Sequence, residues 1–307
     1  MKLPNFLIIG APKAGTSSLY AYLNQHPEIY MSPIKEPHFF MLNDEKANFQ
    51  GPGDQVRFKL SVHQLEEYKK LFEGSKNEIA IGEASTTYLG SNTAPERIKY
   101  YIPDVKLIAI LRNPVDAAYA SFMHLVRDGD ESLKDFELAL QAEEKRLKMN
   151  WDPLWHYTRR GFYYLQVNRY FETFNRDQIK IYIYEDFKKN PNFILKDIFQ
   201  FLNVNENFLI DMSKKYNISG IPKSRVLNSI LLKDNKFKSA AKLLFPRGVR
   251  KSASNQIKLW NMNNLRKPKM SEESRIYLTH LFREDLLRLQ DLIQQDISVW
   301  LNDSIIN

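Results

Sequence analysis

Four short runs of apolar residues alternate with helical patterns along the first two thirds of the chain. The runs are rich in β-branched and aromatic residues, so each is predicted to be a strand: Phe6 to Ile9, Glu78 to Gly82, Val105 to Leu111 and Ile179 to Tyr184. Near-continuous apolar strands separated by helices are typical of a buried parallel sheet. We therefore predict an α/β fold, a central parallel sheet flanked by helices, with ligands bound beyond the carboxyl ends of the strands.

Helical spacing dominates two further regions. Between residues 116 and 148 the pattern predicts two helices, and Ser132 or Asp135 is the candidate cap of the second. From Ser271 to Trp300, large apolar residues recur at helical spacing, which predicts a helical C-terminal part that packs on the core.

The first predicted strand leads into a loop with two glycines and a lysine. Gly10 and Gly15 allow the backbone to turn back closely, Lys13 supplies a positive charge, and residues 16–18 (TSS) open a helix whose amides and hydroxyls can hold an anion. This layout predicts a P-loop-like cradle for a phosphate. A nucleotide-hydrolase loop reads G-x-x-x-x-G-K-[ST], whereas here the lysine precedes the second glycine, so the loop is not built like that of a hydrolase.

Length and charge indicate the number of domains and where the positive charge lies. The 307 residues are 43% apolar, which suffices for a sizeable core, and we expect residues 1–307 to form a single domain. The net charge is +8, but residues 221–270 hold thirteen Lys or Arg and one acid, so the rest of the chain is slightly acidic. This basic, lid-like segment can serve an anionic cofactor, a polyanionic acceptor or a membrane surface, and a merely solvated helical lid is the alternative.

Cysteine is absent, which excludes disulfides, thiolate chemistry and Cys-based zinc sites. The six histidines are scattered without a metal-ligand spacing, so no metal site is expected. The N-terminus enters the first strand without a signal-peptide pattern, and no apolar run is long enough to cross a bilayer. A cytoplasmic enzyme without a transmembrane segment is the expectation.

Residues 12–19, PKAGTSSL, resemble the 5′-phosphosulfate loop of sulfotransferases that use 3′-phosphoadenosine 5′-phosphosulfate (PAPS), especially the bacterial relatives of the heparan sulfate sulfotransferases. Further family motifs follow in order: EPHFF at 36–40, GEAS at 82–85, LRNPVD at 111–116, RGFY at 160–163 and YEDF at 184–187. The resemblance implies transfer of a sulfuryl group to a hydroxyl, or an amine, of a small metabolite or saccharide. The product would be 3′-phosphoadenosine 5′-phosphate (PAP), and no nucleic-acid partner is implied.

The resemblance also implies cofactor contacts. They are Pro12, Lys13, Ala14, Gly15, Thr16, Ser17 and Ser18 around the 5′-phosphate, and Arg112, Ser121, Tyr163, Lys223 and Arg225 elsewhere on the nucleotide. Arg112 resembles the arginine that binds the 3′-phosphate through its bidentate fork. The serine that the family carries eight residues later falls at Ala120, so Ser121 either replaces that hydroxyl or leaves it missing.

Sulfuryl transfer needs charge stabilisation on the bridging oxygen, an in-line approach and a base for the acceptor proton. Lys13 is the candidate for the leaving phosphate. By resemblance Glu36 is the general base, and its apolar neighbours are expected to raise its pKa. His38 is the rival base. The structural alternatives are that Glu36 caps a helix or pairs with Lys35, and that His38 is a buried core residue.

Glu83, at the end of a predicted strand, is a second candidate carboxylate that could orient the acceptor or hold Lys13. Heparan-type enzymes often carry a lysine at the next position, where this chain has Ala84. The missing cation makes a highly anionic glycan a less favoured acceptor.

Two other classes of function stay open. A P-loop nucleotide kinase or hydrolase lacks its Gly-Lys-Ser/Thr here, and the third strand ends in RNP at 112–114 rather than in a magnesium-holding aspartate. A non-catalytic binder of polyanions or membrane surfaces would use residues 221–270. That alternative gives no common explanation of the glycine loop, Glu36 and Arg112.

Overall fold

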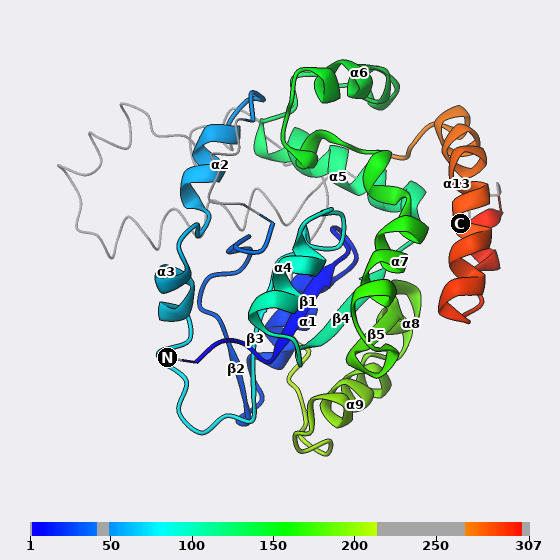
Figure 1. The fold of residues 1–307 in the computed structure, drawn as a ribbon. Helices are drawn as coiled ribbons and strands as arrows, with labels where there is room; N and C mark the ends of the chain where they lie inside the picture. The colour runs from blue at the N-terminus through cyan, green and yellow to red at the C-terminus, as the bar shows by residue number, and fades with distance from the viewer. Residues whose placement is uncertain (1, 42–48, 214–267, 303–307) are drawn as a thin grey trace.

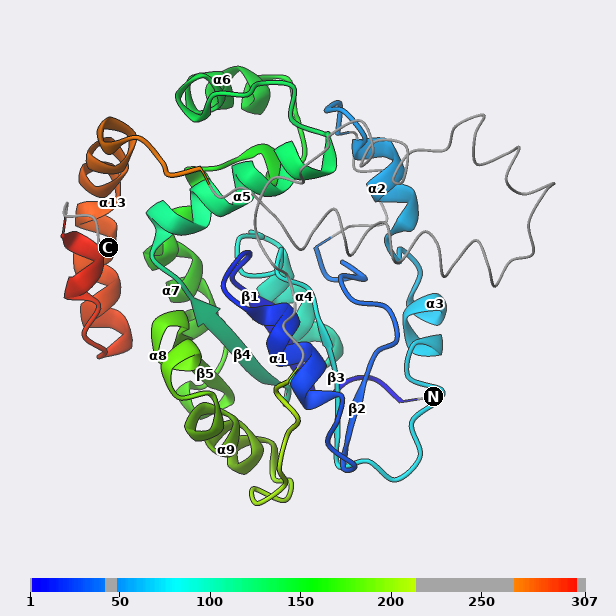
Figure 2. The ribbon, with the colours of Figure 1, turned by 180° about the vertical axis from the view of Figure 1, so that it is seen from behind.

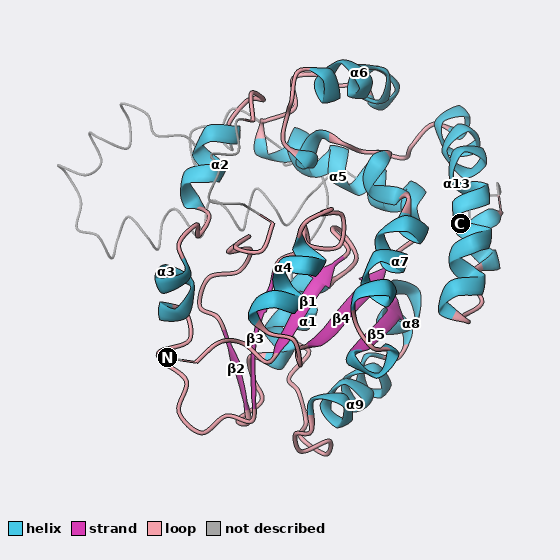
Figure 3. Ribbon diagram, in the orientation of Figure 1, coloured by secondary structure: helices cyan, strands magenta, loops and turns pink. Residues whose placement is uncertain are grey.

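A five-stranded sheet, with all neighbouring strands parallel, forms the centre of the computed structural model, which describes residues 2–41, 49–213 and 268–302 (Figure 1). The strand order is β2-β3-β1-β4-β5. The strands are β1 (Phe6–Gly10), β2 (Ile29–Met31), β3 (Ala80–Ala84), β4 (Lys106–Leu111) and β5 (Ile179–Ile183). Helices flank the sheet, so the predicted α/β architecture is confirmed (Figure 3).

The four predicted strands are all present, with ends shifted by at most two residues. β3 begins at Ala80 rather than Glu78 and runs on to Ala84, because it is paired with β1 on one side and β2 on the other. Glu83 therefore lies within the strand and not beyond its end. The sequence did not predict β2, since three residues, Ile29–Met31, are too few to show a periodic pattern.

Helices cover both faces of the sheet. The helix α4 faces the viewer in Figure 1, whereas α1 faces the viewer in Figure 2, so these two lie on opposite faces. The helices are α1 (Thr16–Leu23), α2 (Asp54–Leu60), α3 (Leu65–Lys70), α4 (Ala94–Tyr101), α5 (Pro114–Asp128), α6 (Phe136–Lys148), α7 (Tyr163–Thr173), α8 (Tyr184–Lys189), α9 (Pro191–Leu202) and α13 (Glu272–Ile293).

Two helices, α6 and α13, begin where their sequence signals place them. Asp135 caps α6, with its carboxylate accepting from the Leu138 N–H at 3.1 Å, so Asp135 and not Ser132 is the cap. Ser271 caps α13, which buries Phe282 against the core, and the predicted helical C-terminal part is confirmed. The helix α5 lies beyond the C-terminal ends of the strands (Figures 1 and 2).

The basic segment 221–270 lies outside the described residues except for its last three positions, and Lys223 and Arg225 lie outside with it. No helix within the described ranges is long and apolar enough to cross a bilayer. Over the same ranges, no three His, Asp or Glu side chains are grouped so as to hold a metal ion.

Candidate active site

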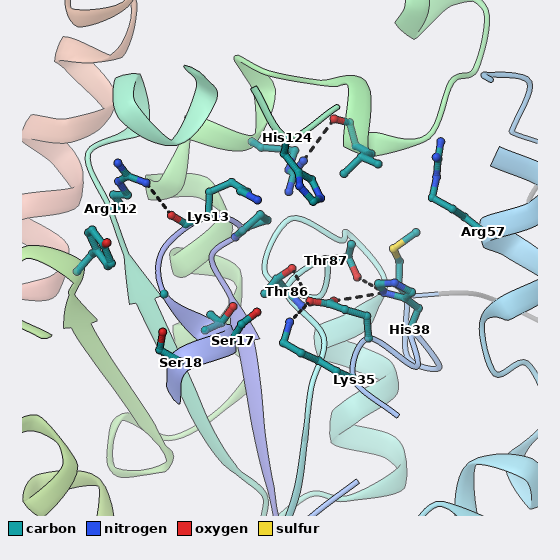
Figure 4. A pocket seen from close by; sticks show the side chains of 18 of the residues that line it. Lys13, Ser17, Ser18, Lys35, His38, Arg57, Thr86, Thr87, Arg112 and His124 are labelled. Carbon is teal, nitrogen blue, oxygen red and sulfur yellow. Dashed lines mark hydrogen bonds and ion pairs between the residues drawn. The ribbon is translucent and has the colours of Figure 1, made fainter. Parts of the chain in front are cut away.

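A cavity of about 710 Å³ lies beyond the carboxyl ends of β1, β3 and β4, where the fold predicts a ligand site (Figure 4). The residues of the sequence prediction that line it are Pro12, Lys13, Gly15, Thr16, Ser17, Ser18, Glu36, His38 and Arg112. Three segments that are far apart in the sequence thus meet in one cavity.

The glycine loop has the tight geometry that its sequence indicates. Gly15 has φ of +87°, and a Cβ at this position would lie 3.1 Å from the ring of Tyr184, so a larger residue would be both strained and crowded. Thr16 is the first residue of α1 and Gly15 is its N-cap, so Thr16 is not the cap. Because the first N–H groups of a helix have no intrahelical acceptor, this N-terminus favours an anion beside it.

Lys13 points from this loop into the cavity, toward His124 (Figure 4). Burial, reinforced by the positive charges of Arg127, Arg160 and Lys35, lowers the pKa of Lys13 from 10.5 to about 8. In these surroundings Lys13 loses its proton more readily than a surface lysine does. An anion that entered the cavity would restore the charged form.

Arg112 ties the end of β4 to the same loop. Its Nη1 donates to the carbonyl oxygen of Lys13 at 3.0 Å, and its guanidinium carbon lies 4.9 Å from the centroid of the Tyr184 ring. Since a guanidinium carries five N–H donors, this contact leaves Arg112 with donors for a ligand. The arginine both positions the Lys13 backbone and lines the cavity.

Glu36 is a paired carboxylate and not an isolated one. It accepts from Lys35 Nζ at 2.7 Å, from the Thr86 N–H at 2.8 Å and from the Thr86 hydroxyl at 3.1 Å. Burial opposes its ionised form, but the charge of Lys35 and these hydrogen bonds outweigh burial and lower the pKa of Glu36 below 4.5. The expectation of a raised pKa was wrong, because the apolar neighbours are not the groups that face the carboxylate. Glu36 is ionised at neutral pH.

His38 lies beside Glu36, with Nδ1 3.8 Å from a Glu36 carboxylate oxygen and 2.8 Å from the Thr87 hydroxyl. Burial lowers the pKa of His38 below 6.5, even though Glu36 and Asp152 oppose that shift. The imidazole is therefore neutral at neutral pH. It lines the cavity rather than lying in the core.

Glu83 is linked to the His38 backbone through Ser85. It is fully buried, does not line the cavity, and accepts from Tyr68 Oη at 3.1 Å and from Ser85 Oγ at 2.9 Å. Ser85 Oγ in turn accepts from the His38 N–H at 3.2 Å. Burial raises the pKa of Glu83 to about 7. These contacts make Glu83 a positioning residue for His38, and its hydrogen bonds do not run to Lys13, in contrast to the prediction.

Three side chains of the cavity stand on strained backbone. Lys13, Glu36 and His38 have φ of 63°, 61° and 60°, in the left-handed region that costs other residues than glycine about 1–2 kcal/mol. Surrounding contacts hold them there, including a hydrogen bond of 2.9 Å from the Glu36 N–H to the Ala84 carbonyl. Strain that is concentrated at one cavity is a feature of functional sites.

Three further residues of the sequence prediction do not line the cavity. Ala14 is fully buried, Ser121 is buried within α5 and Tyr163 is buried at the start of α7. All three side chains are packed in the interior of the protein. Ser121 as a replacement for the hydroxyl that Ala120 lacks stays a prediction.

Sequence reasoning missed several residues that line the cavity: Lys35, Arg57, Thr86, Thr87, His124, Asp152, Arg160 and Lys188. Arg160 is the first residue of the RGFY motif at 160–163, and this motif could have identified it as a site residue. His124 carried none, since it lies inside α5 without a neighbouring motif.

The protonation of His124 follows from its neighbour. Arg127 Nη2 lies 2.5 Å from His124 Nδ1, and because a guanidinium can only donate, Nδ1 is the acceptor. Burial, together with the charges of Lys13 and Arg127, lowers the pKa of His124 to about 3. The ring is thus neutral, with its proton on Nε2, and can serve as a hydrogen-bond donor.

The lining of the cavity is strongly cationic. Among the described lining residues the cations are Lys13, Lys35, Arg57, Arg112, Arg160 and Lys188, and the carboxylates are Glu36 and Asp152. A cavity of this size with converging cations, a glycine loop and a helix N-terminus favours a ligand with more than one anionic group.

Comparisons with known proteins agree in pointing to one family. A family model described as sulfotransferase domain matches residues 3–287. Carbohydrate sulfotransferase 15 of Mus musculus is 28% identical over 250 residues, which cover 66% of this chain and 44% of that protein. The bifunctional heparan sulfate N-deacetylase/N-sulfotransferase 2 of Homo sapiens is 24% identical over 330 residues, or 99% of this chain and 31% of that protein.

The chain therefore spans less than half the length of these curated relatives. A crystal structure of a sulfotransferase from Alicyclobacillus acidocaldarius has a similar fold along almost the entire chain. Its TM-score is 0.78 at 34% identity, and the match covers 98% of this chain and 100% of that one.

Proposed function

This chain belongs to the sulfotransferase family, as its motifs predicted, and from that premise we propose that it transfers a sulfuryl group from PAPS to a hydroxyl or an amine of a small molecule or saccharide. One observation carries the proposal. The glycine loop with Lys13, the arginine Arg112 and the carboxylate Glu36 line a single cavity, although they come from separate parts of the sequence.

The residues fit PAPS by their chemistry. Lys13, Arg112 and the start of α1 offer charge and donors for two separate phosphates. When bound, PAPS supplies a sulfuryl group on a phosphosulfate anhydride. The proposal extends to Lys223 and Arg225 as further contacts with the 3′-phosphate.

Each residue has a distinct task in the proposal. Lys13 offsets the charge that develops on the leaving phosphate, and Glu36, which is ionised at neutral pH, takes the proton of the acceptor. His124 donates a hydrogen bond from Nε2 toward the centre of the cavity. Lys35 and Thr86 hold the Glu36 carboxylate in place.

A saccharide is one candidate acceptor, because one relative is named a carbohydrate sulfotransferase and another carries heparan sulfate in its name. At 24–28% identity, however, the acceptor of a relative is not transferable.

The donor site is tested by the 3′-phosphate. PAP is expected to bind at least tenfold more tightly than AMP, which lacks that phosphate, and more tightly than ATP with magnesium. In Arg112→Ala the affinity for PAP should fall about tenfold to a hundredfold, since a charge-assisted hydrogen bond contributes on the order of 1.5–3 kcal/mol. The affinity for AMP should change little. Isothermal titration calorimetry measures all three ligands.

Arg176→Ala is the matched control, because Arg176 stacks on Phe171 at 3.8 Å and does not line the cavity. Arg112→Lys keeps the charge and separates the loss of the fork from the loss of support for the Lys13 backbone. Equal weakening of PAP and AMP in Arg112→Ala would show that the arginine does not contact the 3′-phosphate. Tight binding of ATP with magnesium and weak binding of PAP would contradict the proposed function itself.

The affinity for PAP should also depend on pH through Lys13. Below pH 7 this lysine is already charged in the free protein, whereas above its pKa of about 8 binding of the anion must draw a proton from solution. PAP affinity is therefore expected to fall about tenfold between pH 7 and pH 9. Calorimetry in two buffers of different ionisation enthalpy measures the proton uptake directly. The uptake should vanish in Lys13→Met, and an unchanged uptake in that variant would assign it to another group.

A further inference from the structure

A second cleft, of about 870 Å³, adjoins the active-site cavity. The residues that line both are Pro12, Met41, Phe49, Thr86, Thr87 and Arg160. Thr86 marks the boundary, because its N–H and its hydroxyl both donate to Glu36. An acceptor whose hydroxyl reaches Glu36 therefore has the second cleft directly beside it for the rest of its atoms.

The far wall of this cleft is apolar. Helices α6, α7 and α13 bound it (Figure 1), and its large apolar side chains are Leu140, Leu147, Phe162, Leu165, Tyr277 and Leu281. Leu165 and Tyr277 are 60% and 56% exposed, although both are large apolar residues. Exposed apolar side chains that gather in a concave surface next to an active site are typical of contacts with a ligand.

Two of the charged groups of the cleft, Glu143 and Arg169, are hydrogen-bonded within the protein. Glu143 accepts from the Thr158 N–H and hydroxyl, both at 2.9 Å, and from the Arg159 N–H at 3.1 Å. Arg169 donates to the Ser91 carbonyl at 3.2 Å. A sugar chain needs many side chains with spare hydrogen-bonding capacity, and a polyanion needs uncommitted cations. The cleft has charges of both signs, with Glu143 and Glu144 beside Arg159, Arg160 and Arg169, and more of its surface is apolar than polar.

Resting on the proposed function, we propose that the acceptor is an alcohol with an apolar body, alkyl or aromatic, that lies in this second cleft. In the transfer, the acceptor oxygen forms a bond to sulfur while the bond from sulfur to the bridging phosphate oxygen breaks. The acceptor proton passes to Glu36. The products are a sulfate ester of the alcohol and PAP, so no further reactant is needed.

Straight-chain primary alcohols test the proposal. With PAPS and the purified full chain, kcat/KM is expected to rise about twofold to fourfold for each methylene from butanol to decanol, because each buried methylene contributes about 0.8 kcal/mol. Mass spectrometry measures the sulfate esters. Desulfated heparan oligosaccharides and simple sugars serve as the competing acceptors, and they should be used at least tenfold less efficiently than decanol.

Leu165→Gln probes the apolar wall without a risk to folding, since the side chain is more than half exposed. It should lower kcat/KM for decanol by about fourfold and flatten the dependence on chain length. Leu138→Gln is the matched control: Leu138 is 52% exposed, lies on α6 and lines neither cavity. This control should behave like the unmodified protein.

PAP affinity, measured on the same preparation, distinguishes failure of the proposed function from failure of the acceptor assignment. If PAP does not bind, the proposed function fails and this inference falls with it. If PAP binds but oligosaccharides are preferred, if no alcohol is sulfated, or if chain length has no effect, the inference is overturned and the donor site stands. Equal behaviour of Leu165→Gln and Leu138→Gln would likewise remove the acceptor from this cleft.

Discussion

Replacing Lys13 by alanine is expected to lower kcat for sulfuryl transfer by about 10²–10³, because loss of one preorganised donor at a developing charge typically has an effect of that size. The lysine reaches the cavity from a loop whose backbone Arg112 holds through the Lys13 carbonyl. The measurement is single-turnover transfer from PAPS, with PAP affinity determined in parallel.

Folding has to be kept apart from chemistry in this experiment. The backbone of Lys13 is left-handed, and alanine bears the same strain there as lysine, so Lys13→Ala should melt within a few degrees of the unmodified protein. Lys13→Met keeps the apolar stem and loses only the charge, and it should be as slow as the alanine variant. Lys196→Ala, on the surface of α9, is the control for loss of a lysine. Near-normal turnover in folded Lys13→Met would remove the lysine from the mechanism.

The sequence predicted the parts of this molecule whose signals are local. Gly15, Lys13 and Arg112 fall at strand ends that the apolar runs define, so a parallel sheet brings them together without further information. Asp135 was one of two local candidates for the cap of α6, and the apolar spacing from Ser271 onward predicted α13. Such predictions need only the pattern of one segment and the topology of the fold.

Other features depend on contacts between distant segments. Glu36 was expected in apolar surroundings, yet Thr86, fifty residues later, donates two hydrogen bonds to it and helps to lower its pKa. Glu83 was expected at a strand end, but pairing with both neighbours places it inside β3 and in the core. His124 lines the cavity because α5 lies across the strand ends, and the sequence alone does not show that placement. No local pattern records these relations.

Glu36→Gln is expected to lower turnover by about 10²–10⁴ while the affinity for PAP stays close to that of the unmodified protein. Glutamine keeps the size of the side chain and can still accept from Thr86, but it cannot take a proton from the acceptor. The ionised carboxylate is the active form, so activity should fall as the pH drops through the pKa of Glu36, which lies below 4.5. That acidic limb should be absent from the residual activity of Glu36→Gln.

Two controls make the assignment specific. Glu66→Gln removes a surface carboxylate that pairs with Lys69 at 2.7 Å, and it should leave turnover unchanged. His38→Ala should have a milder effect than Glu36→Gln, because in the proposed mechanism the neutral imidazole packs beside Glu36 and does not take the proton. If folded Glu36→Gln kept its activity while folded His38→Ala lost it, the two roles would be exchanged. Proton transfer would then run through the His38 imidazole, whose Nδ1 lies 2.8 Å from the Thr87 hydroxyl and whose backbone N–H donates to Ser85, and Thr87 and Ser85 would become the next residues to replace.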